Sequence, residues 1–351
     1  MSKSWLTGKS VLITGAVGTI GSNLLRHIVN LDARVVRAFD HDEHGLFLLQ
    51  QEIGNRENVR WLLGDIRDEI RLRRAMEDVD VVLHAAALKH VLLGEYNPFE
   101  IVQTNLLGLQ NIIQAALENR VERVIFTSSD KAVNPTNAMG ASKLMGERLV
   151  AAAQEAAGSA GTIFASVRFG NVVGSNGSVA PVFEKQIRGG GPVTLTHRRM
   201  TRFVLGVEQA VRLVLHAAEM AVGGELFVLR MPALRISDLA QVMIEQLAPR
   251  YGYRADEIKI KEIGAYPGEK LYEELLIENE LPTSYENDEF VVCLGQEQGS
   301  VPMEKRTYLE TMRPCLSGYN SELAELMTRE EIAEFLQSIG AFSEAAEVSK
   351  V

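Results

Sequence analysis

The stretch SVLITGAVGTIG at residues 10–21 decides the fold expected for this chain. Its first five residues form a short apolar run, and an apolar pattern typical of a helix follows near 18–30. Glycines between a strand and a helix allow a tight turn, close approach of the backbone to a pyrophosphate, and close packing of helix on strand. The helix N-terminus adds N–H donors and a positive dipole end. The stretch predicts a dinucleotide-binding turn made by Gly15, Gly18, Thr19, Ile20 and Gly21.

Apolar runs alternate with helical patterns through the rest of the first half. Short buried strands that alternate with helices indicate βαβ units and a parallel sheet. We therefore predict an α/β fold with a Rossmann-type doubly wound parallel sheet, whose binding crevice lies at the carboxyl ends of the strands. The further strands are expected near 34–39, 58–63, 80–84, 122–127 and 163–168, and the helices near 43–54, 67–77, 98–119 and 138–158.

The composition changes after Gly170, where residues 171–205 are rich in Gly, Pro, Ser and Arg. Helical patterns return near 207–221 and 236–248, with a strand at 225–230 between them. This half is expected to form a smaller, partly interleaved substrate domain.

The expected domains are therefore a dinucleotide-binding domain at 1–170 and a substrate-binding domain at 171–351. From about residue 280 the second domain continues as an acidic, weakly patterned C-terminal extension. Its one clear element is a short helix near 329–339, which begins with a capping-box sequence.

The composition limits the classes of partner. A net charge of −10 argues against nucleic acid or an anionic membrane as the main partner. Cys293 and Cys315 are too few for a disulfide framework, which fits a reducing compartment. The sequence has neither the apolar run of a signal peptide nor about 18 successive uncharged apolar residues. These features predict a cytoplasmic protein. No bound metal is expected, because the histidines lack metal-ligand spacing.

The carboxylate of Asp40 predicts the choice of cofactor. Asp40 ends the second expected strand, roughly 20 residues after the glycine turn, where a carboxylate can bind the adenosine ribose hydroxyls. A carboxylate there repels a 2′-phosphate, so NAD is expected rather than NADP. Small or short side chains just beyond the next two strands would let the dinucleotide pass closely. These additional cofactor residues are Asp65, Ile66, Ala85, Ala86 and Ala87.

The stretch TSSDKAVNPTNAMGASK at 127–143 indicates the chemistry. It follows an apolar strand and sets a hydroxyl, an acid and a base side by side as Ser129, Asp130 and Lys131. The helix that follows carries Met139 and Lys143 on one face, because residues four apart share a face. Beside a nucleotide-binding turn, this predicts a hydride-transfer site that has an acid and a base of its own.

Six motifs in combination resemble those of the extended short-chain dehydrogenase/reductases: TGxxGxxG, HAAALKH, SSDK, MGASK, FGNVVGS and PGEKLYEELL. Within that superfamily the chain resembles the UDP-N-acetylglucosamine 4,6-dehydratases of bacterial polysaccharide and glycoprotein pathways. The resemblance covers roughly residues 8 to 280. It implies a lyase in which NAD takes a hydride from sugar C4 and returns it to C6 after water is eliminated across C5 and C6.

The resemblance also implies residue roles. Asp130 is the acid at the C6 hydroxyl and Lys131 the base at C5, although adjacent opposite charges favour the ionised form of each. Lys143 holds the nicotinamide ribose, and Ser129 contacts O4. Met139 stands where most members carry a tyrosine, which matches the subset that retains the C5 configuration. The O4 proton could leave through Ser129, Asp130 or water.

The substrate residues implied by the resemblance lie in four separate motifs. They are Lys89, Asn171, Arg202 as a diphosphate ligand, and Glu269. Tyr266 departs from the family pattern, because an arginine usually precedes PGEK there. A helix-mediated homodimer or a larger homo-oligomer is also implied.

The expected function is NAD-dependent conversion of UDP-N-acetylglucosamine to the UDP-4-keto-6-deoxy sugar, with retention at C5. One alternative is a nucleotide-sugar epimerase, or a 5,6-dehydratase that stops at an unsaturated sugar. An alternative of another class is a non-catalytic NAD-sensing protein, which the missing tyrosine would suit.

Overall fold

The computed structural model describes residues 4–158, 161–175, 178–266, 268–295 and 301–341. The chain divides into two compact units. Unit 1 consists of Met1–Phe169, Glu208–Arg230 and Leu275–Gly318, and unit 2 of Gly170–Val207, Met231–Glu274 and Tyr319–Val351.

The first boundary lies between Phe169 and Gly170, and the part of the chain that the sequence analysis assigned to one domain of 171–351 alternates between the two units. The chain returns to unit 1 twice, at 208–230 and 275–318. It does so because the apolar runs of these segments, at 225–229 and 290–294, are buried strands of the unit 1 sheet.

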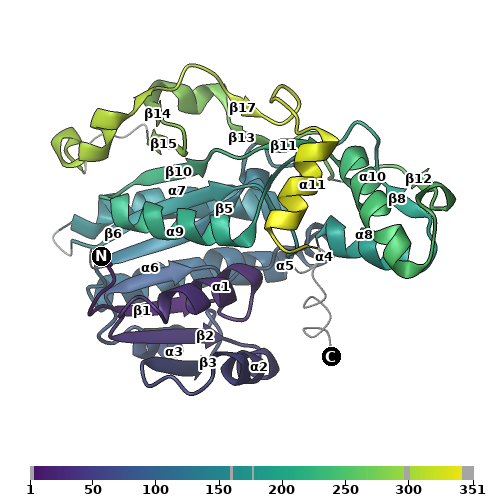
Figure 1. Ribbon diagram of the computed structural model, residues 1–351. Coiled ribbons are helices and arrows are strands. Elements are labelled where there is room, and N and C mark those ends of the chain that lie inside the picture. Colours follow the sequence, from purple (N-terminus) through teal and green to yellow (C-terminus); the bar gives the residue numbers. More distant parts are fainter. Residues whose placement is uncertain (1–3, 159–160, 176–177, 267, 296–300, 342–351) are drawn as a thin grey trace. The chain divides into compact units, whose positions relative to one another are not determined.

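The central sheet of unit 1 confirms the predicted fold class (Figure 1). Its strand order is β16-β14-β15-β10-β6-β5-β4-β1-β2-β3. The pairs from β3 to β10 are parallel, whereas β15, β14 and β16 add antiparallel strands beyond β10. The strands are β1 (Ser10–Thr14), β2 (Val35–Asp40), β3 (Val59–Leu63), β4 (Val81–His84), β5 (Arg123–Ser129), β6 (Ile163–Phe169), β10 (Glu225–Leu229), β14 (Ser284–Glu286), β15 (Phe290–Leu294) and β16 (Arg313–Pro314).

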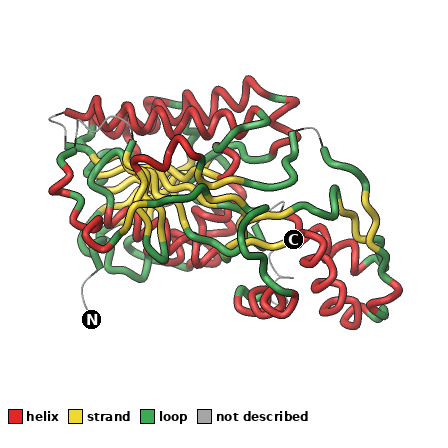
Figure 2. The backbone as a smooth tube through the Cα atoms, turned by 90° about the horizontal axis from the view of Figure 1, so that it is seen from above, coloured by secondary structure: helices red, strands yellow, loops and turns green. Residues whose placement is uncertain are grey.

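Helices lie on both sides of these strands (Figure 2). On one side, α3, α6 and α7 share a continuous apolar core with β1, β4 and β5, in which Leu12, Ile112, Val124 and Val150 are fully buried or nearly so. The helices of this unit are α1 (Thr19–Ile28), α2 (Glu43–Ile53), α3 (Glu69–Ala75), α4 (Val91–Tyr96), α5 (Pro98–Ile101), α6 (Gly108–Glu118), α7 (Ala138–Ala157) and α9 (Val207–Met220), which starts at the last residue of a unit 2 segment.

The helix expected at 98–119 is continuous in the chain but not uniform. A π-helical segment at Val102–Leu107 separates α5 from α6. Such segments insert an extra residue into the turn and are frequent at functional sites. Residue spacing did not predict this segment, nor did it predict α4.

Unit 2 has its own apolar core and contains two small sheets. The sheets are β11-β9-β7 and β12-β8, and α10 packs against both α8 and α11. The expected C-terminal helix is present, and Thr328 and Glu331 form its capping box. The elements are β7 (Asn171–Val172), α8 (Val179–Arg188), β8 (Val193–Leu195), β9 (Thr201–Leu205), β11 (Ala233–Arg235), α10 (Ile236–Leu247), β12 (Ile260–Glu262), β17 (Tyr319–Asn320) and α11 (Arg329–Ser338), with β13 (Glu274–Leu276) at a unit boundary.

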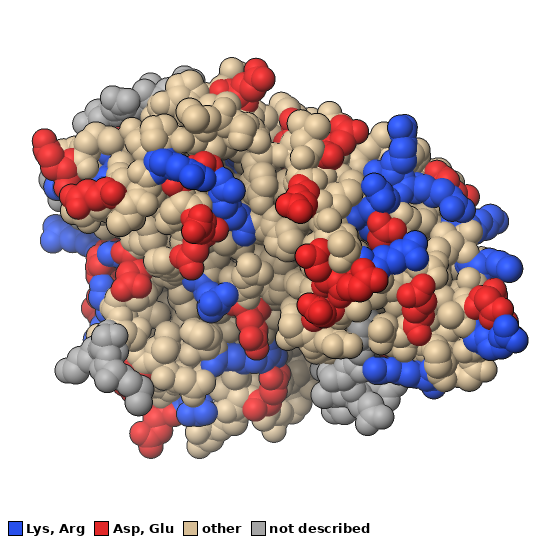
Figure 3. Space-filling view, turned by 45° about the horizontal axis from the view of Figure 1, so that its top comes forward, with Lys and Arg blue, Asp and Glu red and all other residues tan. Residues whose placement is uncertain are grey.

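Short 3-10 helices complete the described chain, at Asp130–Ala132, Ala248–Tyr251, Ala255–Glu257, Glu278–Thr283, Met303–Lys305 and Thr307–Thr311. On the face shown in Figure 3, Lys and Arg side chains are interspersed with Asp and Glu side chains, and neither sign forms a continuous field. Across the described ranges, every helix is too short or too polar to span a bilayer.

Candidate active site

The glycine turn lies directly against the end of a neighbouring strand. Gly15 has a φ of +70°, and a Cβ on it would lie 2.6 Å from the backbone nitrogen of Ala86. A Cβ on Gly21 would overlap the Gly15 carbonyl oxygen, so the start of α1 also needs a glycine. The turn between β1 and α1 therefore has the close approach that a pyrophosphate site requires. Thr19 and Ile20 open α1 just beyond it.

The carboxylate of Asp40 holds the glycine turn in place. Asp40 is buried at the end of β2, and its Oδ2 accepts the Val17 N–H at 3.0 Å. Its Oδ1 accepts the Asp42 N–H at 3.1 Å. Asp40, which the sequence analysis assigned to the cofactor ribose, thus links the end of β2 to the glycine turn.

The two residues after β3 have different surroundings. The Asp65 carboxylate accepts hydrogen bonds from the Arg67 guanidinium, and this contact lowers the Asp65 pKa. Ile66 is buried against Gly108 at the start of α6. The Asp65 side chain is therefore already paired, and its expected cofactor contact stays a prediction.

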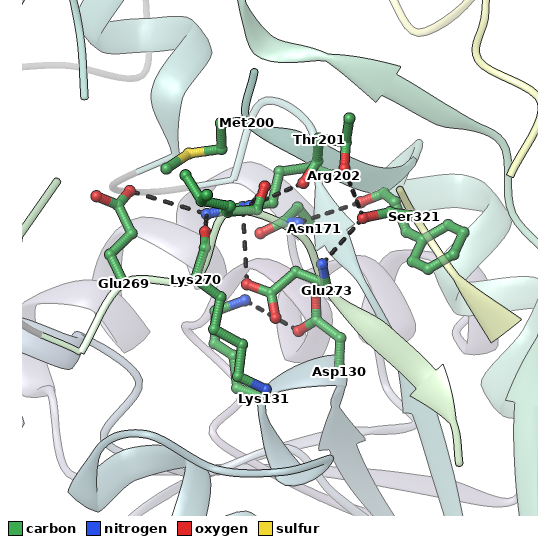
Figure 4. A network of polar contacts seen from close by, with 12 residues as sticks. Asp130, Lys131, Asn171, Met200, Thr201, Arg202, Glu269, Lys270, Glu273 and Ser321 are labelled. Atoms are coloured by element: carbon green, nitrogen blue, oxygen red, sulfur yellow. Dashed lines mark hydrogen bonds and ion pairs between the residues drawn. The ribbon is translucent and has the colours of Figure 1, made fainter. Parts of the chain in front are cut away.

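The acid, base and hydroxyl form one contact group at the end of β5. Asp130 Oδ1 accepts the Ser129 hydroxyl at 2.6 Å. It also accepts the Lys131 ammonium at 2.9 Å (Asp130 and Lys131 are labelled in Figure 4). The Asp130 side chain is fully buried, and its Oδ2 has no hydrogen-bond partner among the described residues. An unsatisfied buried carboxylate oxygen is costly, so Oδ2 is the atom that would carry a proton or meet a donor.

The N-terminus of α7 is fixed against this group. The Asn137 side chain accepts the Gly140 N–H at 2.8 Å as the helix N-cap. A Cβ on Gly140 would overlap the Lys131 carbonyl oxygen, so the glycine allows α7 to lie directly on the 130–132 segment. Met139 is 3 % exposed and lies in the same helical turn.

Lys143 is buried one turn further along α7. Its Nζ donates to the Thr127 carbonyl at 2.8 Å and lies 4.6 Å from the centre of the Phe126 ring. Burial lowers the Lys143 pKa to about 8, and the negative charge of Glu147 opposes that shift. Burial, and then the charge of Lys143, lower the pKa of His84 to about 3, so this imidazole is neutral at physiological pH.

Asn105 is a positioning residue that the sequence analysis missed. It lies in the π-helical segment, and its side chain contacts both the Leu88 N–H at 2.9 Å and the Leu88 carbonyl at 3.0 Å. It also donates to Ser142 Oγ on α7 at 2.9 Å. Asn105 thus joins the segment after β4 to the helix of Lys143. An asparagine inside an apolar helical pattern was the available signal.

The proposed substrate residues divide between the units. Lys89 is exposed between β4 and α4 in unit 1. In unit 2, Asn171 opens β7 and donates to the Phe203 carbonyl at 3.1 Å. The Glu269 carboxylate accepts the Tyr266 N–H at 3.1 Å and lies 3.3 Å from Thr196 Oγ1. Pro267, in the PGEK motif, lies outside the described residues.

Arg202 has different surroundings from those expected of a diphosphate ligand. Its guanidinium donates to the carbonyls of Thr201 at 2.7 Å and Lys270 at 2.8 Å, and its side chain is 10 % exposed (Figure 4). It also lies 3.7 Å from Glu273 and 3.8 Å from Glu269. A diphosphate would have to replace these contacts. Glu273, buried in this network, was not singled out from the sequence.

Comparison with known proteins places the chain in a family. Residues 11–294 match the family model described as polysaccharide biosynthesis protein. An "uncharacterized membrane protein" of Methanocaldococcus jannaschii is 48 % identical, over 94 % of this chain and 96 % of that one. A UDP-N-acetylglucosamine 4,6-dehydratase (inverting) of Campylobacter jejuni is 40 % identical, over 81 % of this chain and 82 % of that one.

Among solved structures, Pen from Bacillus thuringiensis is 40 % identical, with a TM-score of 0.89 over 97 % of this chain and 100 % of that one. The match to the family model includes the glycine turn from Gly15, the 129–131 group and α7, together with most of the sheet that carries them. The chain therefore belongs to the polysaccharide biosynthesis protein family.

Proposed function

We propose that the protein is an NAD-dependent nucleotide-sugar 4,6-dehydratase that converts UDP-N-acetylglucosamine to the UDP-4-keto-6-deoxy sugar with retention at C5. The observation that carries the proposal is the contact group of Ser129, buried Asp130 and Lys131, which lies at the end of β5 and against α7 of a nucleotide-binding fold. The Campylobacter jejuni relative supports the substrate class through its name.

The chain's own residues fit the dinucleotide. Gly15 leaves the space that a side chain would fill, and Asp40 lies at the end of β2. Bound NAD would supply a hydride acceptor for C4 and a hydride donor for C6. Lys143, whose pKa is lowered by burial to about 8, would bind the ribose hydroxyls and supply positive potential.

The proton transfers belong to Asp130 and Lys131. Lys131 in its neutral form takes the C5 proton once C4 is a ketone, and Asp130 gives the proton from Oδ2 to the departing C6 hydroxyl, which leaves as water. Lys131 then returns its proton to C5. The proton that leaves O4, passed to Asp130 directly or through Ser129 or water, replaces the one that Asp130 gives up, so the pair ends the cycle as it began.

The stereochemical part of the proposal rests on Met139. A thioether cannot deliver a proton, so no acid on this side chain competes with Lys131 for C5. Because one base removes and returns the proton, C5 keeps its configuration. The Campylobacter jejuni relative is named as inverting, so product stereochemistry is the finer test.

The experiment is incubation with UDP-N-acetylglucosamine and NAD, followed by mass spectrometry and NMR of the product. The proposal expects loss of one water, a C4 ketone and an unchanged C5. An isomer of the substrate's mass would indicate an epimerase, and a 5,6-alkene would indicate a 5,6-dehydratase. Tight NAD binding without turnover would favour a sensor. We further propose that the protein is cytoplasmic, that it assembles as a homo-oligomer, and that this UDP-sugar is its substrate.

A further inference from the structure

A buried ion cluster in unit 1 contacts the end of β5, next to the 129–131 group. Arg168, on β6, is 1 % exposed and binds two carboxylates at once. Its Nε and one terminal nitrogen donate to Glu147 at 3.0 and 2.7 Å, and its terminal nitrogens donate to Glu280 at 3.0 and 2.8 Å. Paired donors of this kind fix the orientation of both carboxylates.

Glu147 connects this cluster to both elements of the candidate site. Its Oε1 accepts the hydroxyl of Ser128 at 2.6 Å, and Ser128 immediately precedes the 129–131 group. Ser128 and Arg168 are also register partners in the paired strands β5 and β6. Glu147 lies one turn after Lys143 on α7, so both side chains lie on the same side of that helix.

Glu147 also acts on Lys143 through its charge. The carboxylate of Glu147 on α7 raises the pKa of Lys143 against the larger effect of burial, whereas His84 of β4 is neutral at physiological pH. Glu147 therefore favours the protonated form of the buried Lys143 amine. Glu280 binds the same arginine but does not act on Lys143 in this way.

We propose that Glu147 is a positioning residue for the reaction. Through Ser128 it fixes the end of β5 against α7, and through its charge it maintains Lys143 as a cation. Arg168 and Glu280 hold the Glu147 carboxylate in place, which gives the segment at 278–283 a function that its sequence did not reveal. The activity readout of this inference rests on the proposed dehydratase function, but the titration of Lys143 does not.

The test compares Glu147→Gln with Glu280→Gln in the full-length protein. Each change removes one negative charge from the same buried arginine and keeps the side-chain shape, so the two variants should show a similar fall in urea midpoint. The pKa of Lys143 is measured by NMR titration of ¹³C-labelled lysine, with Lys143→Met to assign the signal. The kcat and KM for UDP-N-acetylglucosamine are measured from pH 6 to about pH 10, the range that brackets the Lys143 titration.

Glu147→Gln should lower the Lys143 titration midpoint by roughly 0.5 to 1 pH unit, because an attractive charge is lost. The alkaline limb of kcat should move to lower pH by the same amount, and kcat near neutral pH should fall roughly ten-fold with little change in KM. Glu280→Gln should leave both midpoints at their wild-type values.

An unchanged Lys143 midpoint in Glu147→Gln, or an equal shift in Glu280→Gln, would overturn the inference. If the wild-type protein binds NAD but turns over no UDP-sugar, the dehydratase proposal fails while the NMR titration still tests the role of Glu147. If either variant does not fold, Ser128→Ala tests the β5 contact alone: kcat should fall with the alkaline limb unmoved, and wild-type kcat would contradict the proposed contact.

Discussion

At the scale of single residues, the candidate site combines charged groups that are buried in unit 1. Asp130 is fully buried with one satisfied and one unsatisfied oxygen, and Lys143 is buried over an aromatic ring. The identities of these side chains follow from the sequence, because motifs specify which residues occur, and the roles assigned to them are proposals. The burial and pairing that decide protonation states do not, because they depend on residues distant in the chain such as Phe126 and Glu147.

Replacing either member of the acid–base pair separates catalysis from cofactor binding. Asp130→Asn and Lys131→Ala should each lower the dehydration rate at least roughly 10²-fold, since each removes one positioned proton transfer. Both variants should still bind NAD, because neither residue belongs to the glycine turn. NAD binding by fluorescence and turnover by mass spectrometry give the two readouts. Wild-type turnover in either variant would refute its assigned role.

Lys143 should show a conflict between stability and activity. Folding lowers its pKa from 10.5 to about 8, so the unfolded chain binds more protons between these values and stability rises with pH across that window. Below pH 8, burying the charged Lys143 ammonium costs the folded state up to about 3 kcal/mol of stability. The Thr127 and Phe126 contacts offset part of this cost.

Lys143→Met should therefore abolish turnover but raise the free energy of unfolding at pH 7 by roughly 1–3 kcal/mol. Its advantage over the wild type should shrink as the pH approaches 10. Urea unfolding at both pH values measures this. A variant less stable than the wild type at pH 7 would show that the buried ammonium stabilises the fold.

At the scale of elements, the regular strands and long helices of unit 1 follow from apolar periodicity, and most lie within two residues of their predicted bounds. The departures have a physical cause. The π-helical segment carries Asn105, whose three contacts are to residues distant in the chain, and α4 is too short and too exposed to produce a pattern. Tertiary contacts, rather than local preference, decide both.

The close fit of α7 on the 130–132 segment predicts an unusual effect of a glycine change. Gly→Ala inside a helix ordinarily stabilises by about 1 kcal/mol. Gly140→Ala should instead destabilise by roughly 1–3 kcal/mol and lower kcat roughly ten-fold or more, since the new Cβ meets the Lys131 carbonyl.

Gly189→Ala serves as the matched control, because a Cβ there has only ordinary contacts at 3.6 Å and the backbone φ is −85°. It should leave unfolding and turnover nearly unchanged. Thermal unfolding and steady-state kinetics of the two variants test the fit. Equal stability of Gly140→Ala and the wild type would mean that α7 can move away without cost.

At the scale of the whole molecule, the chain alternates between the two units. After Phe169 it runs through five segments that belong in turn to unit 2 and unit 1. The sequence predicted strands β1 to β6 of the unit 1 sheet, because each βαβ unit is local, but it assigned the remaining parallel strand, β10, to the substrate domain. It did not predict that 275–318 supplies β14, β15 and β16 to that sheet, since antiparallel pairing across long separations leaves little local pattern. Figure 1 labels β14 and β15 beyond β10, in the order that the strand pairing gives.

In the proposed reaction, a hydride leaves C4 of the sugar and returns to C6 of the same molecule. The most direct test uses UDP-N-acetylglucosamine carrying deuterium at C4, with product analysis by mass spectrometry and NMR. The account predicts a product that has lost one water and holds the deuterium at C6. Recovery of an unchanged or epimerised sugar, or loss of the deuterium to solvent, would contradict it.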